Sequence, residues 1–182
     1  SLFEIAFSAS DNPGRDGLAY SMHWWGYADI VATKDFVDLM AEDPDDIRCQ
    51  LLDQVYNGQE IEQNIRYWLM KYPGTSYGVP SVENNYMVFR LSEVYLIAAE
   101  AGLKAGGEYR SPALSYLNDI VSRANPDKSV SDAEFTLDRV LKERRKELVG
   151  EGHRYFDALR NNQTIIRKGG WHLDGIPEEI NW

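Results

Sequence analysis

The residues with the greatest potential for chemistry form a run of charged side chains near the end of the sequence. The run consists of Glu143, Arg144, Arg145, Lys146, Glu147, Glu151, Arg154, Asp157 and Arg160. Such a run usually marks a solvated helix face. Here the apolar stripe through Leu137, Leu141 and Leu148 passes through position 144 or 145, so at least one arginine should face the core.

A buried arginine requires carboxylate partners, because an unpaired buried charge is costly whereas a bidentate pair satisfies the guanidinium donors. Glu100, which lies among alanines on a separate predicted helix, is the most natural partner. We therefore interpret these residues as an ion-pair network that fixes how the helices dock, and we favour this structural role over catalysis. The predicted members are Glu100, Arg144, Arg145, Glu147, Glu151, Arg154, Asp157 and Arg160.

No residue pattern in the sequence selects a catalytic or metal site. The three histidines lie far apart without an HExxH motif, no serine lies in a GxSxG motif, and the many carboxylates single out no pair. The group Asp43, Asp45 and Asp46 lacks the glycine and the final Glu of a calcium loop. The lone Cys49 can form neither an internal disulfide nor a zinc site. We expect a protein that is not an enzyme and holds no metal or cofactor.

Aromatic side chains offer a different chemistry. There are 11 Tyr and 5 Trp against 6 Phe, and many of them lie before position 86. A flat amphipathic ring stacks on the apolar face of a sugar while nearby polar groups bond its hydroxyls, although such rings also fill cores and anchor loops. We select Trp24, Trp25, Tyr27 and Trp68 as candidate ligand contacts.

The predicted elements that would position these residues differ before and after Tyr86. Before it, turn signals separate short segments. Alternation over residues 3–7 predicts a half-buried strand, residues 33–40 predict a helix with Thr33 as N-cap, and Asn57-Gly58 favours a hairpin over a helix.

After Tyr86 the sequence becomes helical. Residues 90–104 predict a helix with a small face around Gly102, which a second helix could approach closely. The second helix is predicted to begin with Ser111 as N-cap and to end at Asn125-Pro126. This pair has the proportions of a tetratricopeptide-type hairpin, which needs neighbours to bury both faces.

A third helical region should run from Ser131 toward Arg160, with a break at Gly150 or Gly152. Its expected buried side comprises Leu137, Leu141, Leu148, Phe156 and Leu159. The predicted fold is therefore mainly α, with tetratricopeptide-like hairpins, irregular loops and short β-hairpins.

The net charge of −10 argues against nucleic acid and against a basic membrane-surface patch. No stretch approaches the roughly 20 apolar residues that span a bilayer, and residues 1–10 lack the features of a signal peptide.

Three segments resemble the SusD/RagB family of outer-membrane nutrient-binding lipoproteins. They are residues 90–101, 117–124 and, most specifically, the charged motif over 143–160. Weaker similarity lies at residues 46–48 and 71–72. The resemblance is to the C-terminal part of the family, with residues 1–182 as a single domain. In it, residues 1–85 form an irregular, aromatic-rich candidate ligand-binding part, and residues 86–182 are a helical scaffold.

This resemblance implies binding of oligosaccharides or other nutrients at the cell surface, for uptake through a SusC/RagA-type TonB-dependent transporter. It places the protein at the outer membrane, held by a lipid anchor on the family's N-terminal part, which is absent from this sequence. The alternative is a tetratricopeptide-like module that binds proteins and not sugars. If family helices are missing here, an apolar face should be uncovered and should promote self-association.

Overall fold

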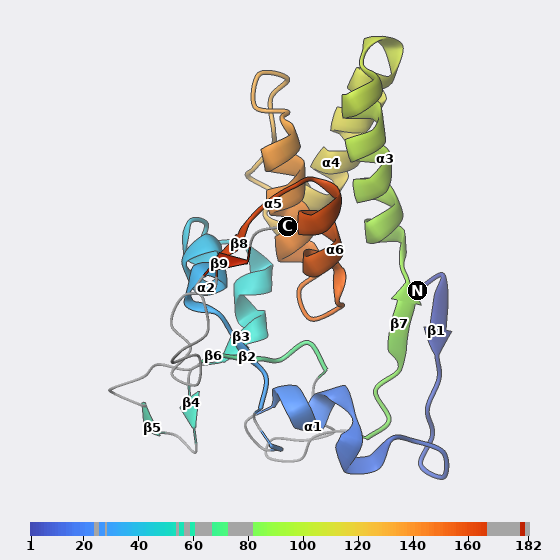
Figure 1. Ribbon diagram of the computed structural model, residues 1–182, viewed down its shortest axis with the longest axis vertical. Helices are drawn as coiled ribbons and strands as arrows, with labels where there is room; N and C mark the ends of the chain where they lie inside the picture. The colour runs from blue at the N-terminus through green and yellow to red at the C-terminus, as the bar shows by residue number, and fades with distance from the viewer. Residues whose placement is uncertain are drawn as a thin grey trace.

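The computed structural model describes residues 1–23, 26–27, 29–53, 55–56, 59–60, 67–72, 82–166 and 179–180 (Figure 1). Four helices form one side of the molecule, and short helices and strands form the rest. The mainly helical fold predicted from the sequence is confirmed.

The helical side is built around the hairpin of α3 (Leu91–Ala105) and α4 (Arg110–Ala124). These helices stand beside α5 (Leu137–Glu147) and α6 (His153–Arg160) in Figure 1. Their shared core contains Leu96, Ala99, Ala113, Leu117, Ile120, Phe135, Val140 and Leu148. The predicted close approach is confirmed, because a Cβ atom on Gly102 would lie 2.6 Å from the Cβ atom of Ala113.

Two helix starts differ from the prediction. The α4 helix begins at Arg110 rather than after Ser111, because the 3₁₀ turn η3 (Gly107–Tyr109) leads directly into it. The α5 helix begins after Thr136, whose hydroxyl accepts from the Arg139 N–H at 3.2 Å. Ser131, predicted as the start of that helix, instead forms a separate turn with Glu134.

The orientation of α6 also differs from the prediction. The break before it is confirmed, since Gly150 and Gly152 have φ of +75° and +82°. Phe156 and Leu159, however, are 64% and 43% exposed instead of buried. The helix turns Asp157 and Ala158 inward, because Asp157 forms ion pairs with Arg144 and Arg160. The polar contact therefore decides which face of α6 is buried.

The first half contains the short helices α1 (Leu18–Met22) and α2 (Lys34–Ala41) and the 3₁₀ turns η1 (Gly14–Asp16) and η2 (Ile47–Leu51). Thr33 caps α2 as predicted, and its hydroxyl accepts from the Phe36 N–H at 3.3 Å. Val149, which follows α5, packs against the apolar cluster around Met22 and Leu69 and also against the one around Phe36. The segment after α5 thus joins the two halves.

The strands form small antiparallel sheets. β2 (Val31–Ala32), β6 (Tyr67–Leu69) and β3 (Leu52–Asp53) make a three-stranded sheet with β6 in the centre. The predicted hairpin is confirmed by the pairing of β4 (Val55–Tyr56) with β5 (Gln59–Glu60). β8 (Ile165–Ile166) pairs with β9 (Glu179–Ile180).

β1 (Phe3–Ile5) pairs with β7 (Tyr86–Phe89). The strand prediction is right but its half-buried face is wrong, since Phe3 and Ile5 are 59% and 48% exposed. Strand pairing, rather than burial, holds β1 in place. Among the described residues, no helix is long and apolar enough to cross a bilayer.

Adding a methyl group at Gly102 tests the α3–α4 contact. We expect Gly102→Ala to lower the free energy of unfolding by about 1–3 kcal/mol, because the new Cβ would also lie 2.8 Å from the Tyr109 carbonyl oxygen. Chemical denaturation measures this change. The control Ala101→Ser, at an exposed position of the same helix, should change it by less than about 0.5 kcal/mol. Equal effects of the two variants would contradict the close contact.

The uncovered face of α3 should cause self-association. Leu91, Val94 and Ile97 are 52%, 38% and 47% exposed along one side of this helix, and Phe156 lies beside Ile97. We expect light scattering to show concentration-dependent oligomers that Ile97→Asp reduces, whereas Ile47→Asp, at an exposed position in η2, has no such effect. A monomer at high concentration that binds no apolar dye would contradict this expectation.

Candidate functional site

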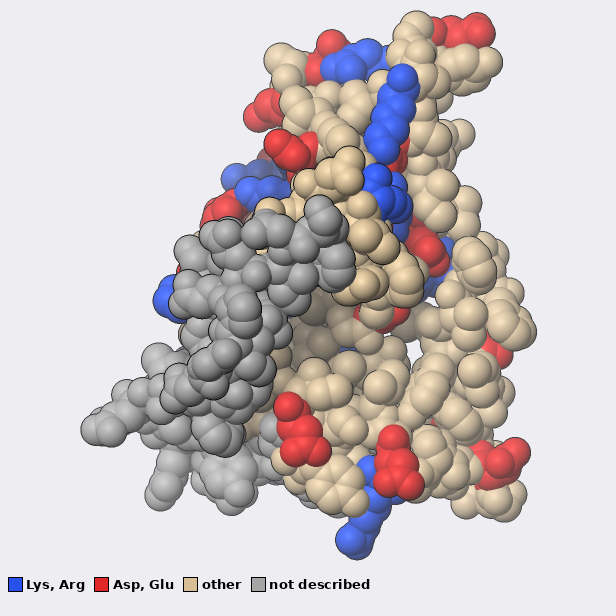
Figure 2. All heavy atoms as spheres, viewed as in Figure 1, with Lys and Arg blue, Asp and Glu red and all other residues tan. Residues whose placement is uncertain are grey.

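The most heavily charged part of the structure is built on three glutamates of the 143–160 motif. Glu143, Glu147 and Glu151 follow one another at four-residue steps along α5 and the turn after it, and their side chains are 2–4% exposed. We call these three residues the glutamate ladder. Acidic and basic side chains also lie interleaved along the helical part of the surface in Figure 2.

Cationic side chains reach the glutamate ladder from four other elements. Arg48 of η2 lies 2.7 Å from Glu143 and 3.1 Å from Glu147. Arg90, which precedes α3, lies 2.6 Å from Glu147 and 2.8 Å from Glu151. The remaining partners from other elements are Arg123 of α4 at Glu147 and Lys71, just after β6, at Glu151. Within α5 itself, Arg139 lies 2.7 Å from Glu143.

These contacts determine the protonation of the ladder. Burial alone would raise the pKa of Glu147, but the hydrogen bond and charge of Arg90, with the charges of Arg123 and Arg48, lower it to about 2. The pKa of Glu151 is also lowered, against burial, by Arg90 and Lys71. Glu147 and Glu151 therefore stay ionised at neutral pH, so these two carboxylates have no proton to donate to a substrate.

A second cluster joins α3, α5 and α6. Arg160 lies 2.6 Å from Glu100 and 2.7 Å from Asp157, and Arg144 lies 2.9 Å from Asp157. Arg144 is 4% exposed and is thus an arginine that faces the core. The expected pairing of Glu100 with Arg144 or Arg145 is wrong, because Asp157 is interposed from α6 and leaves Glu100 to Arg160 and Lys104.

The other predicted network members lie apart from these clusters. Arg145 pairs with Asp35 of α2, and Arg154 donates to the Gln163 side-chain oxygen at 2.9 Å. The sequence interpretation did not assign the cations of the ladder, Arg48, Lys71, Arg90 and Arg123. Their signal was weak, since all four stood only in segments noted for family similarity.

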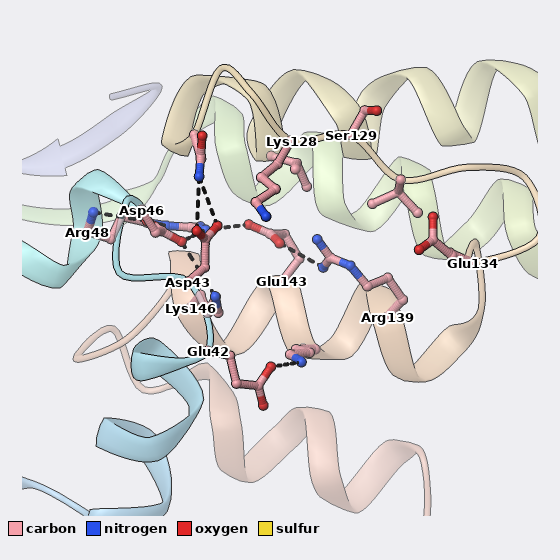
Figure 3. Close-up of a pocket in the computed structure, with 14 residues that line it drawn as sticks. Glu42, Asp43, Asp46, Arg48, Lys128, Ser129, Glu134, Arg139, Glu143 and Lys146 are labelled. Carbon is pink, nitrogen blue, oxygen red and sulfur yellow. Dashed lines mark hydrogen bonds and ion pairs between the residues drawn. The ribbon is translucent and has the colours of Figure 1, made fainter.

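A polar pocket of about 220 Å³ lies between the end of α2, the α4–α5 connection and α5 (Figure 3). Five acidic and five basic side chains line it, and Asp43 accepts from the Asn125 amide at 3.0 Å. Such a lining can bond hydroxyl groups, but no aromatic ring is among its residues. Within the described parts of the chain, no group of His, Cys, Asp and Glu is placed to bind a metal ion.

The candidate ligand aromatics fall in different surroundings. Tyr27 is 53% exposed, and its ring lies 6.0 Å from that of Tyr20. Gly26 makes this turn possible, because a Cβ there would lie 2.2 Å from the Tyr20 carbonyl oxygen. Trp68 is only 2% exposed, in the central strand β6, so its ring offers no open face. Trp24 and Trp25 lie outside the described residues.

Comparison with known proteins gives consistent matches. The family model described as the SusD family matches residues 51–179. SusD-like protein P38 of Formosa agariphila is 30% identical over 115 residues, which make up 57% of this chain and 22% of that protein.

Solved structures match over more of the chain. A SusD superfamily protein of Bacteroides vulgatus ATCC 8482 is 51% identical with a TM-score of 0.91, covering 100% of this chain and 40% of that one. A candidate sugar-binding protein of the same organism is 40% identical with a TM-score of 0.78, covering 91% and 35%. The chain thus spans well under half the length of these relatives.

The cluster at Glu100 makes stability depend on pH. Burial opposes it, but Arg160 and Lys104 lower the pKa of Glu100 from its ordinary 4.5 to about 2. Its contribution is present above about pH 4.5 and is lost as the pH falls toward 2. We expect Glu100→Gln to lower the free energy of unfolding by about 1–2 kcal/mol at pH 7, a value reduced by solvent around Arg160.

Denaturant titrations between pH 7 and pH 2.5 measure this difference. The difference between the original protein and Glu100→Gln should shrink as the pH falls. Glu108→Gln, at an exposed position between α3 and α4, should leave stability nearly unchanged throughout. A difference for Glu100→Gln that is the same at both ends of the range would contradict an ionised, paired Glu100.

Proposed function

The chain belongs to the SusD family, and from this we propose that it contributes to the non-catalytic binding of oligosaccharides at the cell surface. The observation that carries the proposal is the exposed Tyr27 ring, held beside Tyr20 by a turn that requires Gly26. The same loop carries Trp24 and Trp25 in the sequence. A relative of 40% identity described as a candidate sugar-binding protein adds support.

A binding role without catalysis is consistent with the state of the buried carboxylates. A general acid needs a pKa near the working pH, whereas Glu147 and Glu100 have pKa values of about 2. Their oxygens are engaged by arginine side chains of neighbouring elements and, at Glu100, also by Lys104 of the same helix. These groups are suited to hold helices together rather than to transfer protons.

The wider role that we propose follows the family. The protein would pass captured oligosaccharides to a SusC/RagA-type TonB-dependent transporter, in the outer membrane, with its lipid anchor on a part of the protein outside this chain. Family membership is the support for this role.

A second candidate is a protein-binding module. The observation that favours it is the apolar side of α3 formed by Leu91, Val94 and Ile97, which a helix of another protein could cover. Incubation with an oligosaccharide panel separates the candidates. A binder returns intact sugar, an enzyme releases products, and a protein-binding module does neither.

Removing the aromatic rings tests the proposed site. We expect the double variant Trp24→Ala/Trp25→Ala to abolish binding of a sugar found in the panel, and Tyr27→Ala to weaken it by about tenfold, since each stacked ring contributes about 1 kcal/mol or more. Calorimetry measures the affinity, and circular dichroism should show an unchanged helical signal.

The matched control is Tyr109→Ala, which removes a ring that is 59% exposed in η3, far along the chain from the loop. This variant should bind with the original affinity. Unchanged affinity in the double variant would exclude the loop as the sugar site.

A further inference from the structure

A hollow of about 340 Å³, which we call the arginine pocket, lies between α1, α2, β6 and the start of α6. Met22, Phe36, Leu69 and Val149 supply an apolar wall. The charged residues that line it are Arg144, Arg145, Arg154 and Asp157. In Figure 2 the surface is hollowed between the positions of α6 and α1. The polar pocket of Figure 3 lies elsewhere and shares no lining residue with it.

Arg144, which lines this pocket, has an unused donor. Its side chain is 4% exposed, and its Nε donates to Asp157 at 2.9 Å. Its Nη1 atom is buried and has no hydrogen-bond partner among the described residues. A buried guanidinium nitrogen without an acceptor is costly, so a ligand oxygen at this position would restore a lost hydrogen bond.

Arg154 brings a second cation to the pocket. It is partly buried and donates to Gln163, and it makes no ion pair within the described part of the chain. Burial and the nearby charge of Arg145 lower the pKa of Arg154, although the charges of Asp157 and Asp35 act in the opposite direction. A negative group placed between the two arginines would relieve this repulsion.

The start of α6 points to the same chemistry. Gly150, Gly152 and His153 line the pocket, and no side chain caps the helix at Gly152. The first N–H groups of a helix carry partial positive charge and favour an anion. The uncapped helix start therefore adds backbone donors to the pocket that Arg144 also lines.

The described residues that line the pocket carry a positive balance of charge, although the chain as a whole carries −10. Three arginines face one carboxylate, and that carboxylate, Asp157, is already shared by Arg144 and Arg160. Arg145 has its partner in Asp35 of α2, which does not line the pocket.

We propose that the arginine pocket binds the anionic group, a carboxylate or a sulfate ester, of an acidic oligosaccharide. This inference rests on the proposed sugar-binding function and specifies its ligand class. The guanidinium groups would hold two oxygens of the anion, which lysine cannot match in geometry. The apolar wall around Phe36 would receive the less polar face of the sugar ring.

The test compares four tetrasaccharides by calorimetry on the whole chain: oligogalacturonate, its methyl ester, a galactose oligosaccharide carrying 6-sulfate, and the neutral galactose oligosaccharide. We expect at least one anionic form to bind ten or more times tighter than its uncharged counterpart. The carboxylate and sulfate arms identify which anion is preferred. The preference should decrease as salt is added, because the interaction is ionic.

Variants connect this preference to the pocket. Arg154→Gln should remove most of the preference for the anionic oligosaccharide, and Arg154→Lys should retain part of that preference. Arg145→Gln provides a second test of the pocket if Arg154→Gln melts at a lower temperature. Arg15→Gln, which removes an exposed arginine in η1, is the matched control and should leave the preference intact.

Three results would overturn the proposal in distinguishable ways. Equal affinity for charged and uncharged forms would refute the anionic ligand and leave sugar binding in place. Binding of no oligosaccharide at all would remove both this inference and the proposed function. A preference for anions that survives in the Arg154 and Arg145 variants would place the anion site outside this pocket.

Discussion

The structure depends on the need to pair three buried carboxylates on a single helix stripe. Glu143, Glu147 and Glu151 can stay ionised in the interior only if cations reach them, and those cations come from η2, from the end of β6, from the start of α3 and from α4. Each of these elements is thereby held at a defined place along α5. Apolar contacts through Val149 join the same halves but are less directional.

The ion pairs assign most charged residues of the motif to the scaffold rather than to a binding surface. Most charged residues of the 143–160 motif form ion pairs within the glutamate ladder or the Glu100 cluster. The motif therefore says little about the ligand. The recognition that we propose uses the exposed ring of Tyr27 and the arginine pocket, which Arg144 lines. Its Nε belongs to the scaffold through Asp157, whereas its Nη1 is unused. A residue of the family motif can thus take part in a binding site.

Local signals in the sequence were enough to predict several elements. The periodicity of α3 and α4, the Thr33 cap, the Asn57-Gly58 hairpin and the glycine break before α6 all depend on neighbouring residues. Three other features depend on tertiary contacts. They are the exposure of Phe156, the pairing of Glu100 with Arg160 and the burial of Trp68. Each is set by how the helices and strands dock against one another. Ring type alone cannot separate a core Trp from a ligand contact.

A double-mutant cycle between Arg48 and Glu147 tests the central claim most directly, because these residues join the first half of the chain to α5. The account predicts a coupling energy of about 2 kcal/mol or more in the free energy of unfolding. The exposed pair Lys34 and Asp38, with side chains 67% and 61% exposed, provides the reference and should give less than about 0.5 kcal/mol. A coupling between Arg48 and Glu147 as small as this reference would contradict the claim that the glutamate ladder fixes how the two halves dock.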